Sequence, residues 1–400
     1  MDSQGSLRPS PGKPRQPVQA QWIALSDPDV SEREWELVRA ALSRPHLSSG
    51  PLVEAFESEF ANWLGRTYAI ATSSGTLGTL LALRALGLSA GDEVIAPAYG
   101  WHQVAHAIGL AGAIPVFADI DYWTGCLAPA KVAGKITSRT RAILAGNANG
   151  HPAAWGELRA LADAHNLVLI EDSTEAVGSR YRGRLCGSFG DIAVFDFSQP
   201  GALCCGEGGM VVTDKPEWAS ELAYVRARSL SDRNSVSVGS RVPLQACLGE
   251  LAAALGLAQL ERIDLILARR KQVEGWYLRH MASFEGIKPP YLGTDVDEVH
   301  WMLYVAHLGK RFTASARAQI VEDLAACSIE SAAYCVPLHQ QFFYETYGGK
   351  RGQLPDTERI GDRSLALPLH AHLDEEQVKF IVRSLKDASV NVGAGAAIYL

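Results

Sequence analysis

The sequence predicts an α/β fold in which helices cover a mostly parallel sheet. Between about residues 50 and 215, short apolar runs typical of buried strands alternate with helix-like stretches. These stretches are long enough to hold the crossover helix that a parallel pair of strands requires. The runs predicted as strands are residues 68–72, 93–97, 114–118, 141–145, 167–170, 192–195 and 209–213. A helix predicted over 77–86, stopped by Gly87, follows the first strand.

A different pattern begins near residue 249 and predicts a second, smaller domain. Ala and Leu at core spacing predict a helix over 249–260 that continues through Arg270. Residues 301–306 and the region near Ile329 resemble strands of an antiparallel sheet. Acidic residues at 374–376 open a final helix, as the helix dipole favours. We therefore expect a flexible leader over 1–20, a large domain over 21–260, a small domain over 261–390 and a tail over 391–400.

Charge and composition narrow the class of partner. The 400-residue chain has a net charge of −7 and no basic block, which argues against nucleic acid or an anionic membrane. No apolar run reaches the roughly 18 residues that span a bilayer. The seven cysteines are scattered, odd in number and without a C-x-x-C pair. We therefore expect reduced thiols, a cytoplasmic location and no metal site.

Seven short motifs occur in a fixed order along most of the chain. They are residues 74–76, 97–101, 170–172, 187–192, 206–209, 250–260 and 367–373. In this order and at this spacing they resemble the DegT/StrS family of sugar aminotransferases, from about residue 45 to 387. Members of that family use pyridoxal phosphate (PLP). The resemblance implies fold-type-I architecture: a large domain around a mixed seven-stranded sheet, a smaller C-terminal α/β domain, and a homodimer.

The resemblance also assigns cofactor-binding roles to matching residues. Asp172 matches the carboxylate that keeps the PLP pyridine nitrogen protonated, because opposite charge favours the protonated form. Gly75 and Thr76 match the turn whose backbone N–H groups hold the cofactor phosphate at a helix N-terminus. Trp101 matches the aromatic residue that stacks on the cofactor ring.

Several positions depart from the family pattern. Gly201 stands where the pattern F-S-F-x-x-x-K has the lysine that forms a Schiff base with PLP, and glycine can neither tether PLP nor shuttle protons. The serine that faces the phosphate is Asp196 here. At about 4 Å its charge would oppose a phosphate by roughly 4 kcal/mol per charge pair. Glu175 replaces a frequent glutamine, Asn147 replaces a histidine, and Gln245 is the nearest match to the asparagine that reaches the partner's phosphate. Together these changes predict that the chain does not form the usual internal aldimine.

Other polar residues are candidates for an altered chemistry in the same cavity. The predicted catalytic groups are Asp172, Glu175, His102 and Asp196. Further candidates are Glu171, His106 one helical turn after His102, His151 at the rim, and the thiols of Cys204 and Cys205. The histidines equally fit solvent-facing or hydrogen-bonded positions, and buried cysteines are commonly packing residues.

Three functions remain open from the sequence. The first, which we favour, is an enzyme of sugar or secondary metabolism that acts on a sugar-like or amino-bearing small molecule without covalent PLP. The second is a lysine-free enzyme that holds PLP or pyridoxamine phosphate (PMP) non-covalently. The third is a catalytically inert partner of an active aminotransferase paralogue.

Overall fold

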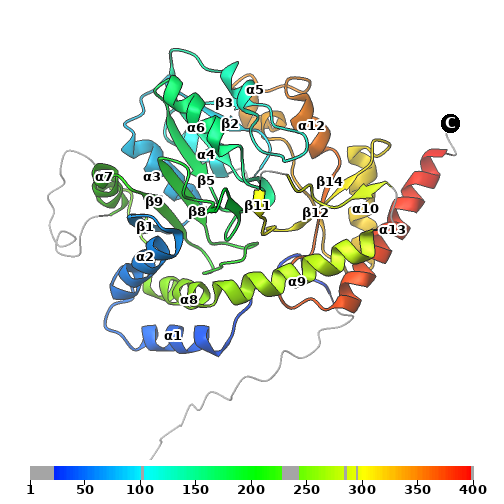
Figure 1. The fold of residues 1–400 in the computed structure, drawn as a ribbon, viewed down its shortest axis with the longest axis horizontal. Helices are drawn as coiled ribbons and strands as arrows, with labels where there is room; N and C mark the ends of the chain where they lie inside the picture. The colour runs from blue at the N-terminus through cyan, green and yellow to red at the C-terminus, as the bar shows by residue number, and fades with distance from the viewer. Residues whose placement is uncertain (1–21, 101–102, 228–242, 283–285, 294–295, 398–400) are drawn as a thin grey trace, which may run out of the picture.

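The structure, a computed structural model, describes residues 22–100, 103–227, 243–282, 286–293 and 296–397 (Figure 1). Its centre is a seven-stranded sheet of order β1-β9-β8-β5-β4-β2-β3. The strands are β1 (Tyr68–Thr72), β2 (Glu93–Pro97), β3 (Ile114–Ala118), β4 (Thr140–Gly146), β5 (Val168–Asp172), β8 (Ile192–Asp196) and β9 (Gly209–Thr213). Neighbours from β8 to β3 are parallel, whereas β9 is antiparallel to both β1 and β8. This confirms the predicted α/β fold around a mixed sheet, and each of the seven strands predicted between residues 68 and 213 is present with ends within two residues.

Side-chain alternation along the strands divides the core between two faces of the sheet. In β8, Ile192 and Val194 pack on one face, while Ala193 and Phe195 pack on the other. The first face is covered by α3 (Gly75–Ala85), α4 (Gln103–Leu110) and α7 (Pro216–Arg226). The second is covered by α2 (Pro51–Leu64), α6 (Trp155–Ala164) and α8 (Glu250–Glu261). Alternation therefore places Asp196, at the end of β8, on the α3 face.

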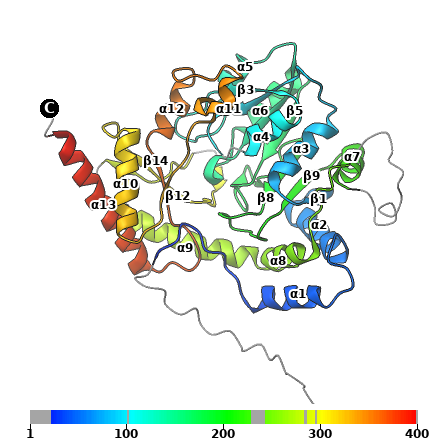
Figure 2. The same cartoon turned by 180° about the vertical axis from the view of Figure 1, so that it is seen from behind.

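A second, antiparallel sheet follows in the C-terminal part of the chain. Its order is β10-β12-β14-β13. The strands are β10 (Ile287–Lys288), β12 (Tyr304–Leu308), β13 (Ala332–Ala333) and β14 (Ser364–Leu367). Three helices pack with it around one core: α9 (Ile263–Met281), α10 (Ala314–Ala326) and α13 (Glu375–Ala397), seen from behind in Figure 2.

Shorter elements complete the described part. They are α1 (Glu32–Leu42), α5 (Pro129–Ala133), α11 (Phe342–Glu345), α12 (Pro355–Gly361), η1 (Ala148–Gly150), η3 (Leu338–Gln340) and a small sheet of β6 (Arg180–Tyr181), β7 (Arg184–Leu185) and β11 (Val296–Glu298). Within these described ranges, no helix has the length and apolar character needed to cross a membrane.

The structure differs from the predicted elements in three places. The helix expected to run unbroken through Arg270 is interrupted at Arg262, whose guanidinium is held by Asp29 and Glu34 from the start of the chain. The strand expected from 301 begins later, because the amides of the residues before it bond to Asn149 instead. The helix α13 extends through Ala397, into the stretch predicted as a tail.

Candidate functional site

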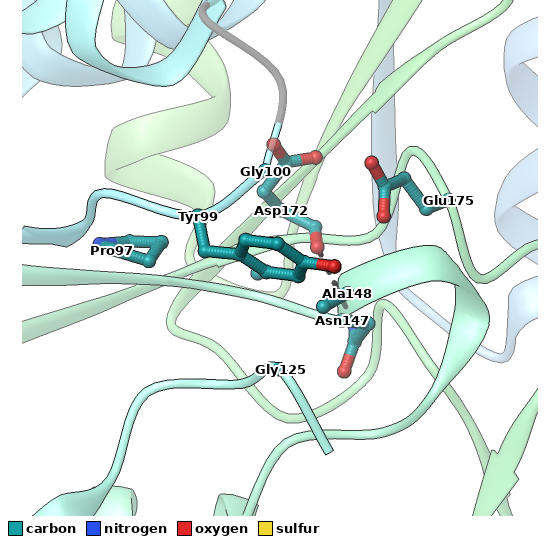
Figure 3. A pocket seen from close by; sticks show the side chains of 9 residues that line it. Pro97, Tyr99, Gly100, Gly125, Asn147, Ala148, Asp172 and Glu175 are labelled. Atoms are coloured by element: carbon teal, nitrogen blue, oxygen red, sulfur yellow. Dashed lines mark hydrogen bonds between the residues drawn. The ribbon is translucent and has the colours of Figure 1, made fainter. Parts of the chain in front are cut away.

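A cavity lies where strands β2, β4 and β5 end, at the edge where α/β proteins commonly bind ligands (Figure 3). The empty space of this cavity is about 390 Å³, a volume that includes the part open to solvent. The described residues that line it are Pro97, Tyr99, Gly100, Gly125, Gly146, Asn147, Ala148, Asp172 and Glu175. None of these carries a positive charge, and two of them, Asp172 and Glu175, carry a carboxyl group.

Asp172 is the last residue of β5 and contributes one of these carboxylates. Its Oδ1 accepts a hydrogen bond from the backbone N–H of Thr174 at 3.0 Å. Burial raises the pKa of Asp172 above its ordinary value. The negative charges of Asp196 and Glu171 add to this rise, and the hydrogen bonds from Thr174 oppose it.

Glu175, three residues further on, contributes the second carboxylate and is only 8% exposed. Its Oε2 accepts hydrogen bonds from the Asn149 N–H and the Tyr334 hydroxyl. Its Oε1 is buried and has no hydrogen-bond partner among the residues that the structure describes. Burial raises the pKa of Glu175 to about 8, although these two hydrogen bonds lower it. Glu175 is therefore mostly protonated at pH 7, and one of its oxygens is available to a ligand.

Two tyrosines that the sequence did not single out hold this corner of the cavity. Tyr99 lines the cavity, and its hydroxyl donates to the Tyr334 carbonyl at 3.1 Å. The two rings meet edge to face, with centroids 5.5 Å apart. Tyr99 falls within the motif at 97–101, so the sequence carried a signal for it. Tyr334 lies in the C-terminal part of the chain, and no motif marked it.

Gly75 and Thr76 form the first turn of α3, as the resemblance implied. The Gly75 N–H, however, already donates to Oδ2 of Asp196 at 2.7 Å. The other carboxylate oxygen of Asp196 accepts from the backbone N–H of Ser198 at 2.8 Å and from the Ser198 hydroxyl. With both oxygens hydrogen-bonded and 5% of the residue exposed, Asp196 is better placed to fix the start of α3 than to move protons.

Gly201 lies in the loop that joins β8 to β9. A Cβ at this position would meet only the carbonyl oxygens of Leu203 at 3.4 Å and Ser198 at 3.5 Å, which is ordinary contact. A side chain would therefore fit. In the same loop, burial raises the pKa values of the Cys204 and Cys205 thiols, which makes them poor nucleophiles near neutral pH.

The structure assigns structural contacts to several other candidates. Glu171 is fully buried on the sheet face opposite Asp172, and its oxygens accept hydrogen bonds from the backbone N–H groups of Gly187, Phe189 and Gly190. The Asn147 amide bonds to Glu171 and to the indole of Trp155. His151 is 3% exposed, bonds to a carbonyl and a backbone amide, and has a pKa lowered by burial.

The remaining candidates lie outside the cavity lining or outside the described residues. His106, on α4, stacks on the ring of Tyr344 at 6.1 Å. Gln245 is exposed. Trp101 and His102 fall outside the described residues, so their predicted roles stay predictions. Across the ranges the structure covers, no three or more His, Cys, Asp or Glu side chains are grouped so as to hold a metal ion.

The mixed seven-stranded sheet, the acidic end of β5 and the Gly-Thr start of α3 together define an aminotransferase-like protein of the PLP-dependent fold. The chain belongs to the DegT/DnrJ/EryC1/StrS aminotransferase family, whose model matches residues 28–386.

Known proteins are similar over nearly the whole chain. The GDP-perosamine synthase of Caulobacter vibrioides is 34% identical over 370 residues, which are 92% of this chain and 98% of that protein. DesV of S. venezuelae, solved in complex with a ketimine intermediate, is 32% identical with a TM-score of 0.82, covering 90% of this chain and 94% of DesV. Spr1654 from Streptococcus pneumoniae, solved in its PMP form, is 25% identical with a TM-score of 0.88, covering 94% of this chain and all of Spr1654.

The family and these neighbours indicate a PLP-type cofactor for this fold, but the residues of this chain do not fit one. Asp172 ends β5 and lines the cavity, and its predicted role toward a cofactor stays a prediction. The helix start that would receive the phosphate is instead occupied by the Asp196 carboxylate. The position of the tethering lysine is glycine. The side chains of the cavity itself therefore supply its chemistry.

Proposed function

We propose that this chain is an enzyme of sugar or secondary metabolism that keeps the aminotransferase scaffold but works without covalently bound PLP. It acts on a sugar-like or amino-bearing small molecule through Asp172 and Glu175. Membership of a sugar aminotransferase family supports the substrate class. Gly201 supports the loss of the covalent cofactor, because no amine is present at that position.

The observation that carries the proposal is the unpartnered Oε1 of Glu175 in a cavity whose described lining has no positive charge. A buried polar atom without a partner is costly, and a ligand group would relieve that cost. A protonated Glu175 donates a hydrogen bond or a proton, and the Asp172 carboxyl group accepts hydrogen bonds from an ammonium group. Two carboxyl groups in one cavity can serve as an acid and a base.

Ligand binding tests this function. We expect amino sugars to bind about tenfold or more tightly than their N-acetylated counterparts in calorimetry, because acetylation removes the positive charge. Asp172→Asn should weaken amino-sugar binding by roughly tenfold, as expected when one partner of a charged hydrogen bond is lost. Asp387→Asn, on the exposed face of α13, is the control and should bind as the wild type does.

Equal binding of charged and acetylated sugars would contradict the proposal. If no amine binds and Asp172→Asn changes nothing, the inert partner of a paralogue becomes the better hypothesis. The non-covalent PLP or PMP enzyme is favoured by the position of Asp172 and disfavoured by the hydrogen bond between Asp196 and Gly75.

We also propose that the chain forms a homodimer. Large apolar side chains are exposed near α1 and the start of α8, including Leu42, Leu47 and Leu251. Exposed apolar patches commonly mark protein interfaces. Light scattering on a sizing column should give twice the 43.1 kDa mass of one chain, and Leu42→Glu with Leu47→Glu should shift the protein toward that single-chain mass. A wild type that elutes at 43.1 kDa at all concentrations would contradict the dimer.

A further inference from the structure

We propose that Asp196 is a built-in anion at the start of α3, which excludes phosphate and restricts the cavity to ligands that carry no phosphate at this position. Asp196 and Gly75 lie outside the described lining of that cavity, but the charge of Asp196 raises the pKa of Asp172, which does line it, so the inference deepens the proposed function by naming which ligands can enter. It follows from contacts between residues that are 121 positions apart.

The first step is the hydrogen bonding of the helix start. The first N–H groups of a helix lack partners within the helix and are commonly paired with an anion or a capping side chain. Here the Gly75 N–H donates to Asp196 at 2.7 Å, and the Leu77 N–H donates to the hydroxyl of Ser74 at 3.2 Å. Both N–H groups are thus paired within the protein.

The second step is the space at the helix start. A Cβ on Gly75 would lie 2.5 Å from Cβ and 2.7 Å from Oδ2 of Asp196. The carboxylate therefore lies directly against the backbone of the glycine. A phosphate oxygen cannot contact the same N–H unless Asp196 moves.

The third step is the rigidity of Asp196. Its backbone N–H donates to the Thr174 hydroxyl at 3.1 Å, and its Oδ1 accepts from the Ser198 N–H at 2.8 Å. Movement of the side chain would break the bonds to Gly75 and Ser198 together. A negative charge at a helix N-terminus is favourable, so the helix dipole also holds the carboxylate in place.

These contacts assign Asp196 as a residue that determines ligand specificity. The family has a serine at this position, which carries no charge and leaves room for a phosphate. The aspartate therefore places its own carboxylate, which is part of the protein, where the family binds the phosphate of a ligand. A ligand of this cavity is then a neutral or amine-bearing molecule at the end nearest α3.

Binding of PMP and of inorganic phosphate tests the inference without reference to activity. PMP is suitable because it lacks the aldehyde that reacts with surface lysines. In calorimetry we expect no saturable PMP binding by the wild type up to about 1 mM, and at least about tenfold tighter binding by Asp196→Ser. Inorganic phosphate should raise the melting temperature of Asp196→Ser but not that of the wild type.

Two further variants keep the result interpretable. Asp196→Asn preserves the shape of the side chain and removes its charge, so it should bind PMP more tightly than the wild type even if Asp196→Ser folds poorly. Asp387→Ser removes one negative charge from exposed α13 and should leave PMP binding unchanged. Tight PMP binding by the wild type, or equal gains in Asp196→Ser and Asp387→Ser, would overturn the inference. Amino-sugar binding that depends on Asp172 is measured separately, so a failure here leaves the proposed function standing.

Discussion

The double variant Gly201→Lys with Asp196→Ser should take up PLP covalently at position 201, where the wild type has no amine to react. A Cβ at position 201 has only ordinary contacts, so the backbone of the loop accepts a residue with a side chain there. The serine opens the start of α3 to the phosphate and removes a repulsion of about 4 kcal/mol per charge pair. After borohydride reduction and digestion, mass spectrometry should find the PLP adduct on the peptide that contains residue 201 in the double variant and no adduct on that peptide in the wild type, since only the engineered amine lies there.

Two matched variants separate the contributions of the amine and the anion. Gly201→Lys alone should bind PLP weakly, because Asp196 still occupies the helix start. Gly201→Arg with Asp196→Ser has a similar length and charge but no nucleophilic amine, so it should hold PLP without a reducible adduct. Non-covalent PLP binding by the double lysine variant without any adduct would show that position 201 does not face the cofactor cavity.

Replacing Glu175 by glutamine should change how stability depends on pH. The folded-state pKa of Glu175 is raised to about 8, above its ordinary value of 4.5. The folded protein therefore keeps this proton over a range in which the unfolded chain has released it. The stability that protonated Glu175 contributes is fully present below about pH 4.5. Between about pH 4.5 and 8 it falls by roughly 1.4 kcal/mol per pH unit, and above about pH 8 it is lost. Glu175→Gln has no proton to lose and should lack this slope.

Urea unfolding at pH 5, 7 and 9 measures this effect. We expect Glu175→Gln to be more stable than the wild type at pH 9 and to lose that advantage at pH 5. Glu59→Gln, on the exposed face of α2, is the control and should follow the wild type at each pH. Parallel pH curves for the wild type and Glu175→Gln would show that Glu175 is ionised at neutral pH in the folded protein.

The sequence predicted the central sheet closely because its signals are local. Each buried strand is a short, nearly continuous apolar run, and its length and the turn residues that bound it distinguish it from a helix. The break between α8 and α9 could not be predicted in this way. Arg262 leaves the helical conformation where its guanidinium meets Asp29 and Glu34, more than 200 residues earlier.

The candidate site, too, could be predicted where nearby residues carry the signal, but not where contacts join residues far apart in the sequence. The motif register placed Asp172 and Glu175 in one cavity. The predicted catalytic role of Asp196 rested on its type and position, whereas its hydrogen bonds to Gly75 and Ser198 depend on how β8 meets α3. Similarly, no pattern near Tyr334 indicated that its hydroxyl would reach a carboxylate 159 residues away.

That contact between Tyr334 and Glu175 joins the two sheets through the phenolic hydrogen of the tyrosine. Tyr334 follows a strand of the antiparallel sheet, and Glu175 follows a strand of the central one. Any displacement that withdraws the phenol leaves the carboxyl with one stabilising donor fewer and makes it a weaker acid. The acidity of the Glu175 carboxyl group therefore depends on how closely the two sheets are held together.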